Sequence, residues 1–563
     1  MKFKILLCLL SILEVNYISR AQNFSWAKQI SGSDYETVNA MAVDQNGNVY
    51  TAGSFPGTTD FDPGVGSYNL TAISTDIFVS KLNSSGDFIW AKKMGGLNSS
   101  AQCNSIAVDD YGNIYLTGSF SQTVDFDPDS GTYNLTSATN NDIFIEKLDS
   151  SGNIIWARNI SGPTFGSFDE GNSITIDKNG NSYISGNFSG SADFDPDTSN
   201  FNLTAFGNDD NFILKLNASG DFVFAKQLGG INLDWNYSIA LDTFGNIFTT
   251  GFFTNSADLD PGVNTFNVSG NGEEAFISKL DSSGNFIWAR KFSGANGDEY
   301  GKSITLDKLG NVYSTGYYSD STDFDPGTGV YYLTAEYYDI YISKLDSGGN
   351  FIWAKRIGGP DYDEPTKILL DAGNNVYITG SYVDSADFDP GSGVYYLSNI
   401  SHANCFVTKL DNSGNLIWAK QMSGIGESYG TSIGLDASEN IYLTGNFSNN
   451  IDCDPGNGVV TFNTSGDNDV FIVKLLSLST NVENNIDDKN VYNIYPNPSS
   501  GKFNISGTEN FNDVRVRNIL GEIIYHSREL QKSLSFQLEK SGIYFVEITT
   551  EKGILSKKII VTQ

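Results

Sequence analysis

The sequence predicts an all-β protein, and three observations lead to that prediction. The chain of 563 residues holds 58 glycines and 37 phenylalanines, which suits short strands joined by tight turns. Apolar and polar residues alternate over short runs, and no run of helical period reaches a convincing length. Similar text also returns throughout residues 23–475 at a nearly fixed spacing, which is the signature of a repeat fold.

Three dipeptides mark the repeat. Asp-Pro steps fall at Pro63, Pro128, Pro196, Pro261, Pro326, Pro390 and Pro455, with differences of 65, 68, 65, 65, 64 and 65 residues. Lys-Leu steps fall at Lys81, Lys147, Lys215, Lys279, Lys344, Lys409 and Lys474. Trp-Ala steps fall at Trp26, Trp90, Trp156, Trp288, Trp353 and Trp418, and Phe224 takes the place of the seventh tryptophan.

One repeat contains four strand-like runs, at residues 105–109, 113–120, 143–148 and 153–160. Short segments with Gly and Asn, which accept the positive φ of tight turns, separate the first two runs and the last two. Each repeat is therefore expected to form a four-stranded antiparallel meander. A lone meander cannot bury its two apolar faces, whereas radial stacking of such blades can.

The reading frame of the array predicts how its ends meet. The array opens with fourth-strand text at residues 24–30 and stops after third-strand text at residues 470–475. The N-terminal strand should therefore complete the last blade. We predict a seven-bladed β-propeller over residues 22–476, with repeats of about 65 residues, closed by this N-terminal strand.

The two ends of the chain differ from the array. Residues 1–21 read as a secretory signal peptide, with Lys2 and Lys4 before a short apolar run and a cleavage site after Ala21. That run is too short to cross a bilayer, and no transmembrane segment is predicted elsewhere. Residues 477–489 are polar and suit a linker. Residues 490–563 carry about seven short strand patterns, which predict a small Ig-like β-sandwich.

Both parts resemble known families. The text GNIYLTG at 112–118, DIFIEKL at 142–148 and DSSGNIIWA at 149–157 resembles the bacterial SBBP-type β-propeller repeat. That resemblance implies the fold and almost nothing about activity. The text YPNPSSGKFNI at 495–505, GIYFVEI at 542–548 and KKIIV at 557–561 resembles the type A C-terminal sorting domain of the type IX secretion system. It implies recognition by that machinery, export through the periplasm and a secreted or outer-membrane surface location.

Charge excludes some partners. The chain has 34 Lys and Arg against 66 Asp and Glu, a formal net charge of −32. Residues 23–489 hold 22 basic and 58 acidic side chains, so their net charge is −36. Such a surface should repel nucleic acids and anionic membranes, and we expect no nucleic-acid partner.

Enzyme motifs are scarce. The chain has two histidines, His402 and His526, and no motif sets a nucleophile beside either one. Phosphate loops, dinucleotide fingerprints and zinc spacings do not occur. We therefore expect a non-enzymatic protein with no cofactor, apart from a structural Ca²⁺ considered next.

The Asp-Phe-Asp-Pro text offers the best metal candidate. Alternating carboxylates can wrap a hard cation such as Ca²⁺. Two of the repeats add a third aspartate, so the metal candidates are Asp125, Asp127, Asp129, Asp193, Asp195 and Asp197. The alternative is architectural, because Asp before Pro starts turns and its side chain caps neighbouring amides.

The segments between repeats offer the best ligand-binding candidates, because aromatic and acidic residues stand side by side there. Those segments should share one face with the Asp-Phe-Asp-Pro loops, since both are alternate connections of the antiparallel strands and so lie at the same end of the blade. The candidates are Tyr35, Phe168, Asp234, Trp235, Tyr300 and Tyr362. Trp235 is the least expected, because every other tryptophan lies in a Trp-Ala step. The alternative is that these aromatics only pack between blades.

The sequence therefore predicts a secreted or cell-surface propeller that binds an extracellular glycan or protein through its acidic, loop-bearing face. Two alternatives stay open. One is a polysaccharide-active hydrolase or lyase that uses carboxylates on that face. The other is a purely structural surface component.

Overall fold

The computed structural model describes residues 23–138, 140–162, 169–197, 199–294, 297–477, 492–518, 523–550 and 553–562. The expected signal peptide, residues 478–489 of the expected linker, and Phe168 lie outside the described residues. The chain divides into two compact units, Met1–Ser477 and Leu478–Gln563. The regular elements of the described residues are all strands, as the sequence predicts.

The first unit consists of four-stranded antiparallel groups in the order of the repeats. The first three groups are β2 (Thr37–Val43), β3 (Val49–Asp60), β4 (Asn69–Leu82) and β5 (Phe88–Met94); β6 (Ala101–Val108), β7 (Ile114–Phe120), β10 (Asp142–Leu148) and β11 (Ile154–Ile160); and β12 (Glu170–Ile176), β13 (Ser182–Asp193), β14 (Asn202–Leu216) and β15 (Phe222–Leu228). In the second group, the short strands β8 (Thr123–Asp125) and β9 (Asn134–Thr136) pair with each other.

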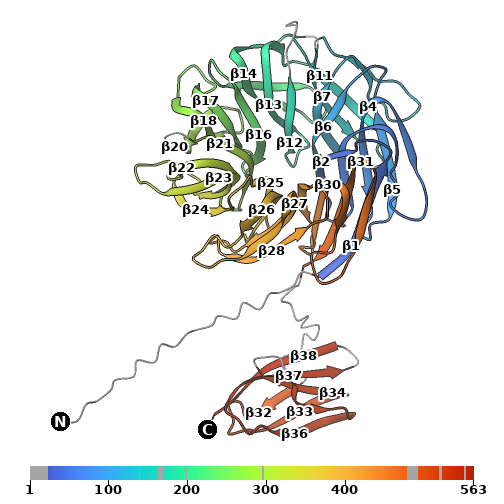
Figure 1. Cartoon of the computed structure of the whole chain (residues 1–563), viewed down its shortest axis with the longest axis vertical. Coiled ribbons are helices and arrows are strands. Elements are labelled where there is room, and N and C mark those ends of the chain that lie inside the picture. The colour runs from blue at the N-terminus through green and yellow to red at the C-terminus, as the bar shows by residue number, and fades with distance from the viewer. Residues whose placement is uncertain are drawn as a thin grey trace, which may run out of the picture. The chain divides into compact units, whose positions relative to one another are not determined.

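Three more groups follow the same plan. They are β16 (Asp234–Leu241), β17 (Ile247–Asp258), β18 (Asn267–Leu280) and β19 (Phe286–Lys291); β21 (Glu299–Leu306), β22 (Val312–Asp323), β23 (Tyr332–Leu345) and β24 (Phe351–Ile357), with β20 (Ser293–Gly294) beside β22; and β25 (Glu364–Leu370), β26 (Val376–Asp387), β27 (Tyr396–Leu410) and β28 (Leu416–Met422). Figure 1 shows these groups following one another around a common axis.

The last group draws strands from both ends of the array. It contains β29 (Ser428–Leu435), β30 (Ile441–Asp452), β31 (Thr461–Leu476) and β1 (Asn23–Gly32). Strand β1 pairs antiparallel with β31 from Asn23 opposite Leu476 to Ile30 opposite Val470. Two further residue pairs join β1 to β3, so this sheet runs from β29 through to β5. None of the sheets in the described residues closes on itself through hydrogen bonds.

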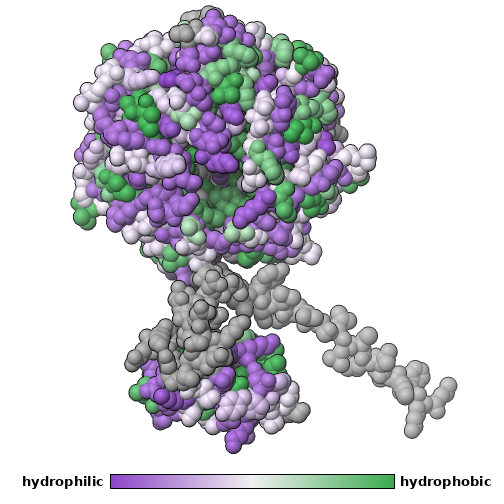
Figure 2. Space-filling view, turned by 180° about the vertical axis from the view of Figure 1, so that it is seen from behind, coloured by the Kyte–Doolittle hydropathy of each residue, from purple (hydrophilic) through white to green (hydrophobic). Residues whose placement is uncertain are grey.

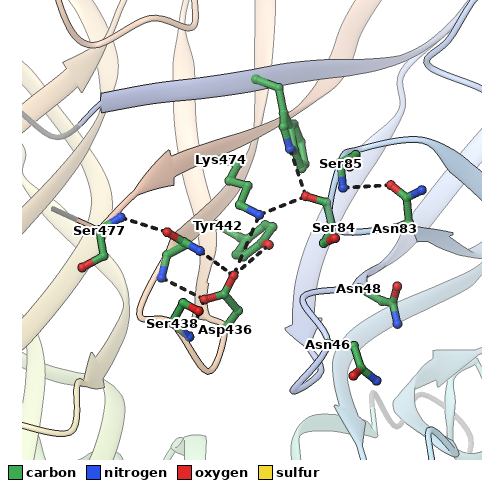
Figure 3. A network of polar contacts seen from close by, with 12 residues as sticks. Asn46, Asn48, Asn83, Ser84, Ser85, Asp436, Ser438, Tyr442, Lys474 and Ser477 are labelled. Carbon is green, nitrogen blue, oxygen red and sulfur yellow. Dashed lines mark hydrogen bonds and ion pairs between the residues drawn. The ribbon is translucent and has the colours of Figure 1, made fainter. Parts of the chain in front are cut away.

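The same contacts join successive groups. In every group except that of Lys409, the lysine of the Lys-Leu step donates to a backbone carbonyl in the next group's hairpin turn, as Lys81 does to Ser150 at 3.3 Å. The equivalent bond from Lys474 to the carbonyl of Ser84, at 2.9 Å, connects the last group to the first (Figure 3). Trp26 Nε1 donates to that carbonyl at 3.3 Å. The first strands also contact one another in sequence, and β29 contacts β2.

Hydrophobic cores lie between neighbouring groups. In one core, Phe61 from the first Asp-Phe-Asp-Pro loop is buried together with Tyr442 and Val470 from the last group. Phe61 meets Phe55 edge to face, with 5.3 Å between ring centroids. The phenylalanine of this loop therefore fills the space between groups, which explains its recurrence.

The second unit is a small two-sheet structure. One sheet contains β32 (Tyr492–Tyr495), β33 (Lys502–Phe511) and β36 (Gln531–Gln537); the other contains β35 (Ile523–Ser527), β34 (Asp513–Asn518), β37 (Gly542–Thr550) and β38 (Gly553–Val561). Phe503 and Phe536 from the first sheet and Val514 and Val546 from the second lie in one hydrophobic core. The two sheets therefore pack against each other.

Candidate functional site: an aromatic rim on one loop-bearing face

The first strand of each group starts on the face that carries the Asp-Phe-Asp-Pro loops. Backbone bridges show this placement, because the segment before a first strand pairs with the end of the second strand in the same group. Examples are Gly229 with Asp258 and Ser423 with Asp452. Residues at the start of the first strands therefore surround the central axis on the face that carries these loops, which we call the mouth.

Two adjacent groups differ from the rest at this mouth. Trp235 lies opposite Phe252 in one group, and Tyr300 lies opposite Tyr317 in the next. The equivalent pairs in the other groups contain at least one polar aliphatic side chain: Thr37 with Ser54, Gln102 with Ser119, Glu170 with Asn187, Glu364 with Ser381 and Tyr429 with Asn446. A departure from the repeat in adjacent groups is unexpected if the residues serve only the shared scaffold.

These rings belong to a continuous set that we call the aromatic rim. Its members are Trp235, Tyr237, Phe252, Tyr300, Tyr317, Tyr338 and Tyr362. Phe252 meets Tyr300 at 4.9 Å between centroids, and Tyr300 stacks on Tyr317 at 4.5 Å. Tyr362 lies 5.5 Å from Tyr317 and 5.4 Å from Tyr338. The rim therefore extends over the first strands β16, β21 and the start of β25.

The rim has a buried layer and a solvent-facing layer. Phe252 and Tyr317 expose only 3% and 9% of their surface. Trp235, Tyr300 and Tyr362 are half-buried and rest against them. Rings fixed from below and open on one side can stack on a planar or apolar ligand surface at little cost in side-chain entropy.

Carboxylates border the rim and accept hydrogen bonds from its indole and hydroxyl groups. Trp235 Nε1 donates to Asp209 Oδ2 at 3.3 Å, and the Tyr300 hydroxyl donates to Glu273. The Tyr338 hydroxyl donates to Asp298 Oδ2 at 3.5 Å. Burial raises the pKa of Asp209, and burial together with Asp298 raises the pKa of Glu273. These acids therefore supply hydrogen-bond acceptors beside the rings.

One cation lies inside the rim. Lys302 Nζ sits 4.3 Å from the centroid of the Tyr237 ring and forms an ion pair with Glu364 at 2.8 Å. Burial, followed by the nearby Glu364 and Glu273 charges, raises the pKa of Tyr237, so its hydroxyl stays protonated at neutral pH. The rim thus presents aromatic faces, carboxylate acceptors and donors within one surface.

Of the six predicted ligand residues, Phe168 lies outside the described residues, and the other five lie in different surroundings. Trp235, Tyr300 and Tyr362 meet in the rim, and Tyr35 is 52% exposed beside Asn468, outside the rim. Asp234 is fully buried, and its carboxylate accepts the amides of Gly230 and Thr254 at 2.5 and 3.1 Å. These bonds tie Asp234 to the loop before β16 and to β17.

Other rim residues escaped the sequence reasoning. Tyr237, Phe252, Tyr317 and Tyr338 lie further inside strands β16, β17, β22 and β23, where alternating aromatic residues are also typical of buried strand positions. A position-by-position comparison of repeats contains the signal. The position of Phe252 holds Ser54, Ser119, Asn187, Ser381 and Asn446 in groups without an aromatic pair.

The aspartates of the Asp-Phe-Asp-Pro loops bind backbone amides. Asp125 Oδ1 accepts from the amides of Asp127 at 3.0 Å and Tyr133 at 2.7 Å, and Asp127 Oδ1 accepts from Asp129 at 3.0 Å. Asp129 itself pairs with Lys92 at 2.5 Å. Asp193, Asp195 and Asp197 repeat the amide bonds. Within the described ranges, no cluster of three or more His, Cys, Asp or Glu could hold a metal ion. The hydrogen bonds from backbone amides to these aspartates agree with the interpretation of the loops as turns.

Family models match segments of both units. The beta-propeller repeat family (SBBP) matches residues 25–54, 89–119, 287–325 and 352–381. The secretion system C-terminal sorting domain matches residues 493–562. Both predicted resemblances are thereby confirmed. The sorting domain indicates recognition by the type IX machinery and export to the cell surface or extracellular space. Among the described residues there is no helix that could span a membrane.

Individual relatives are distant. An uncharacterized WD repeat-containing protein of Acanthamoeba polyphaga mimivirus is 24% identical over 505 residues, which cover 75% of this chain but only 36% of that protein. Sqt1 from Chaetomium thermophilum is 8% identical with a TM-score of 0.39, covering 81% of this chain and 99% of that one. The pyranose dehydrogenase PQQ domain from Coprinopsis cinerea is 13% identical with a TM-score of 0.33, covering 81% and 98%. Similarity this low assigns no activity.

Proposed function

We propose that this chain, which carries β-propeller repeats and a type IX sorting domain, is a non-enzymatic cell-surface or secreted protein that binds a glycan through the aromatic rim. In this proposal the first unit is a seven-bladed ring closed by β1, and the second is an Ig-like sandwich that directs export. The contacts of Lys474 and Trp26 with Ser84 support the ring, because they repeat between the last and first groups the contacts made elsewhere.

The confinement of paired aromatic residues to two adjacent groups carries the functional proposal. A sugar ring offers apolar C–H faces for stacking and hydroxyls for hydrogen bonds. The rim offers Trp235 and Tyr300 as stacking surfaces, with Asp209 and Glu273 as acceptors beside them. Aromatic side chains with polar atoms dominate binding energy at many recognition surfaces. The acidic surface favours a neutral or cationic glycan over an anionic one.

A glycan array probed with the secreted full chain tests this proposal. We expect binding to a restricted set of neutral or cationic glycans, and loss of that binding in the double variant Trp235→Ala, Tyr300→Ala. The matched control is Tyr111→Ala, Phe244→Ala, which removes two aromatic residues that are 84% and 83% exposed. They lie in the hairpin turns after β6 and β16, at the opposite ends of the first strands from the rim. Binding that survives in the rim variant, or an array with no bound glycan, would contradict the proposal.

A second candidate is a polysaccharide-active enzyme, favoured by the raised pKa values of acids around the rim. Burial and the neighbouring Asp209 raise the pKa of Glu170, as burial and Asp298 do for Glu273. In glycosidic cleavage, a protonated acid can donate a proton to the leaving group while a neighbouring ionised carboxylate acts as nucleophile or general base. Reducing-sugar release from glycans that bind on the array, lost in Glu273→Gln, would favour the enzyme.

A further inference from the structure

A cavity of about 390 Å³ opens along the axis of the first unit. It is lined by the later residues of the first strands, whereas the aromatic rim lies at the beginnings of those strands. In β16, for example, Trp235 belongs to the rim and Ile239 to Leu241 line the cavity. Figure 2 shows a central hollow with hydrophobic residues visible inside it. The cavity and the rim are therefore separate sites.

One charged residue, Lys367, stands among the described residues that line this cavity. Its neighbours there are apolar or small, such as Ile304, Leu306, Ile368 and Leu435. In the part of the chain that the structure describes, Lys367 Nζ has no hydrogen bond or ion pair, whereas Lys302 pairs with Glu364. None of the described lining residues carries a carboxylate. Lys367 is half-buried, and its ammonium group has no counter-charge among the described residues that line the cavity.

Lys367 also departs from the repeat. The equivalent position opposite the second strand holds Ser105, Ser173, Ser238, Ser303 and Ser432, and Ala40 in the first group. Several of these serines have a structural role, since Ser303 Oγ accepts the amide of Ile368 at 3.3 Å and Ser238 Oγ accepts that of Ile304 at 3.3 Å. Protonated lysine has no acceptor and cannot replace that bond. The structural role of the serine at this position therefore does not account for the presence of Lys367.

We propose that the axial cavity binds a small organic carboxylate, with its apolar chain along the Ile and Leu lining and its carboxylate at Lys367 Nζ. Charge complementarity selects the head group, because Lys367 is the charged residue of the lining and is cationic. The lining selects an apolar chain. Burial lowers the pKa of Lys367 in the unliganded protein, and a bound carboxylate would raise it again. This site does not depend on glycan binding at the rim.

Calorimetric titration of the full chain with octanoate, and separately with 1-octanol, tests the proposal. Octanoate should bind one to one and more tightly than the alcohol. The variant Lys367→Ser should bind octanoate about tenfold to a hundredfold more weakly and leave octanol binding unchanged. Serine is the residue that most other repeats carry here, so the variant should fold. The variant Lys302→Met, which changes the lysine of the rim, should bind octanoate as the original protein does.

Two results would overturn the proposal. The first is the absence of octanoate binding at every concentration below its micelle range, which would remove the carboxylate site. Alternatively, octanoate and octanol could bind equally to the original protein and to Lys367→Ser, in which case the cavity holds an apolar chain without recognition by Lys367.

Discussion

At the scale of single residues, like-charged carboxyl pairs are buried at the junctions between groups. The pairs are Glu36 with Asp469, Asp234 with Asp210, Glu299 with Glu274 and Asp363 with Asp339. Burial, reinforced by the second carboxyl, raises the pKa of Asp234 to about 7 and that of Glu299 and Asp363 to about 8. These groups are therefore protonated in the folded protein at mildly acidic pH.

The pairs make stability depend on pH. A pKa raised by folding contributes stability that is fully present below the ordinary carboxyl pKa and is lost as pH rises through the folded value. The free energy of unfolding should therefore fall between pH 5 and pH 8.5. In Glu299→Gln the amide oxygen can still accept from Thr322 Oγ1, which preserves the folded structure. Because glutamine does not titrate, the fall in the free energy of unfolding should be smaller by at least about 2 kcal/mol. Urea unfolding at both pH values measures this, with Asp325→Asn in an outer loop as control. Equal falls in all proteins would contradict it.

The Asp-Phe-Asp-Pro aspartates give a second residue-scale prediction. Since Asp127 and Asp195 each accept a backbone amide, we expect the melting temperature to be indifferent to millimolar Ca²⁺ and to EDTA. Thermal melts of the original protein and of Asp127→Asn, Asp195→Asn test this expectation. A rise with Ca²⁺ that this double variant abolishes, but that Asp260→Asn, Asp325→Asn keeps, would establish a calcium site in the second and third groups.

At the scale of elements, the sequence predicts the features that recur from one repeat to the next. Strand runs, turns and the pairing of residues 24–30 with the last repeat all follow from alternation, Gly and Asn turns and the reading frame, and the structure contains them. The rim was predicted only in part. Tyr317 meets Tyr362 and Tyr237 meets Lys302 across the junctions between groups, and local sequence patterns do not contain such contacts.

Strand β1 gives the element-scale prediction. Deleting residues 24–30 would leave β31 as an unpaired edge, which is prone to join other chains. We expect a lower melting temperature and oligomers by size-exclusion chromatography. A chain truncated after Ser477 keeps the β1–β31 pairing and is the control. A deletion variant that stays monomeric with unchanged melting would argue against a ring that depends on β1.

At the scale of the whole molecule, the sorting domain and the repeats lie in different compact units. The sorting domain occupies residues 493–562, and the repeats end before it. Truncation after Ser477 should therefore leave the first unit folded and keep it in the periplasm of a host with the type IX system. Immunoblots of periplasm and medium measure this. Normal amounts of the truncated chain in the medium would show that export does not need the tail.

The central claim is that the aromatic rim binds a glycan, and calorimetry with the glycan selected on the array tests it most directly. The secreted full chain should bind one equivalent. Trp235→Ala, Tyr300→Ala should raise Kd about thirtyfold or more, because truncating aromatic anchors typically costs at least about 2 kcal/mol. The control Tyr111→Ala, Phe244→Ala should keep the original Kd. Equal Kd values for the rim variant and the original protein would contradict the account.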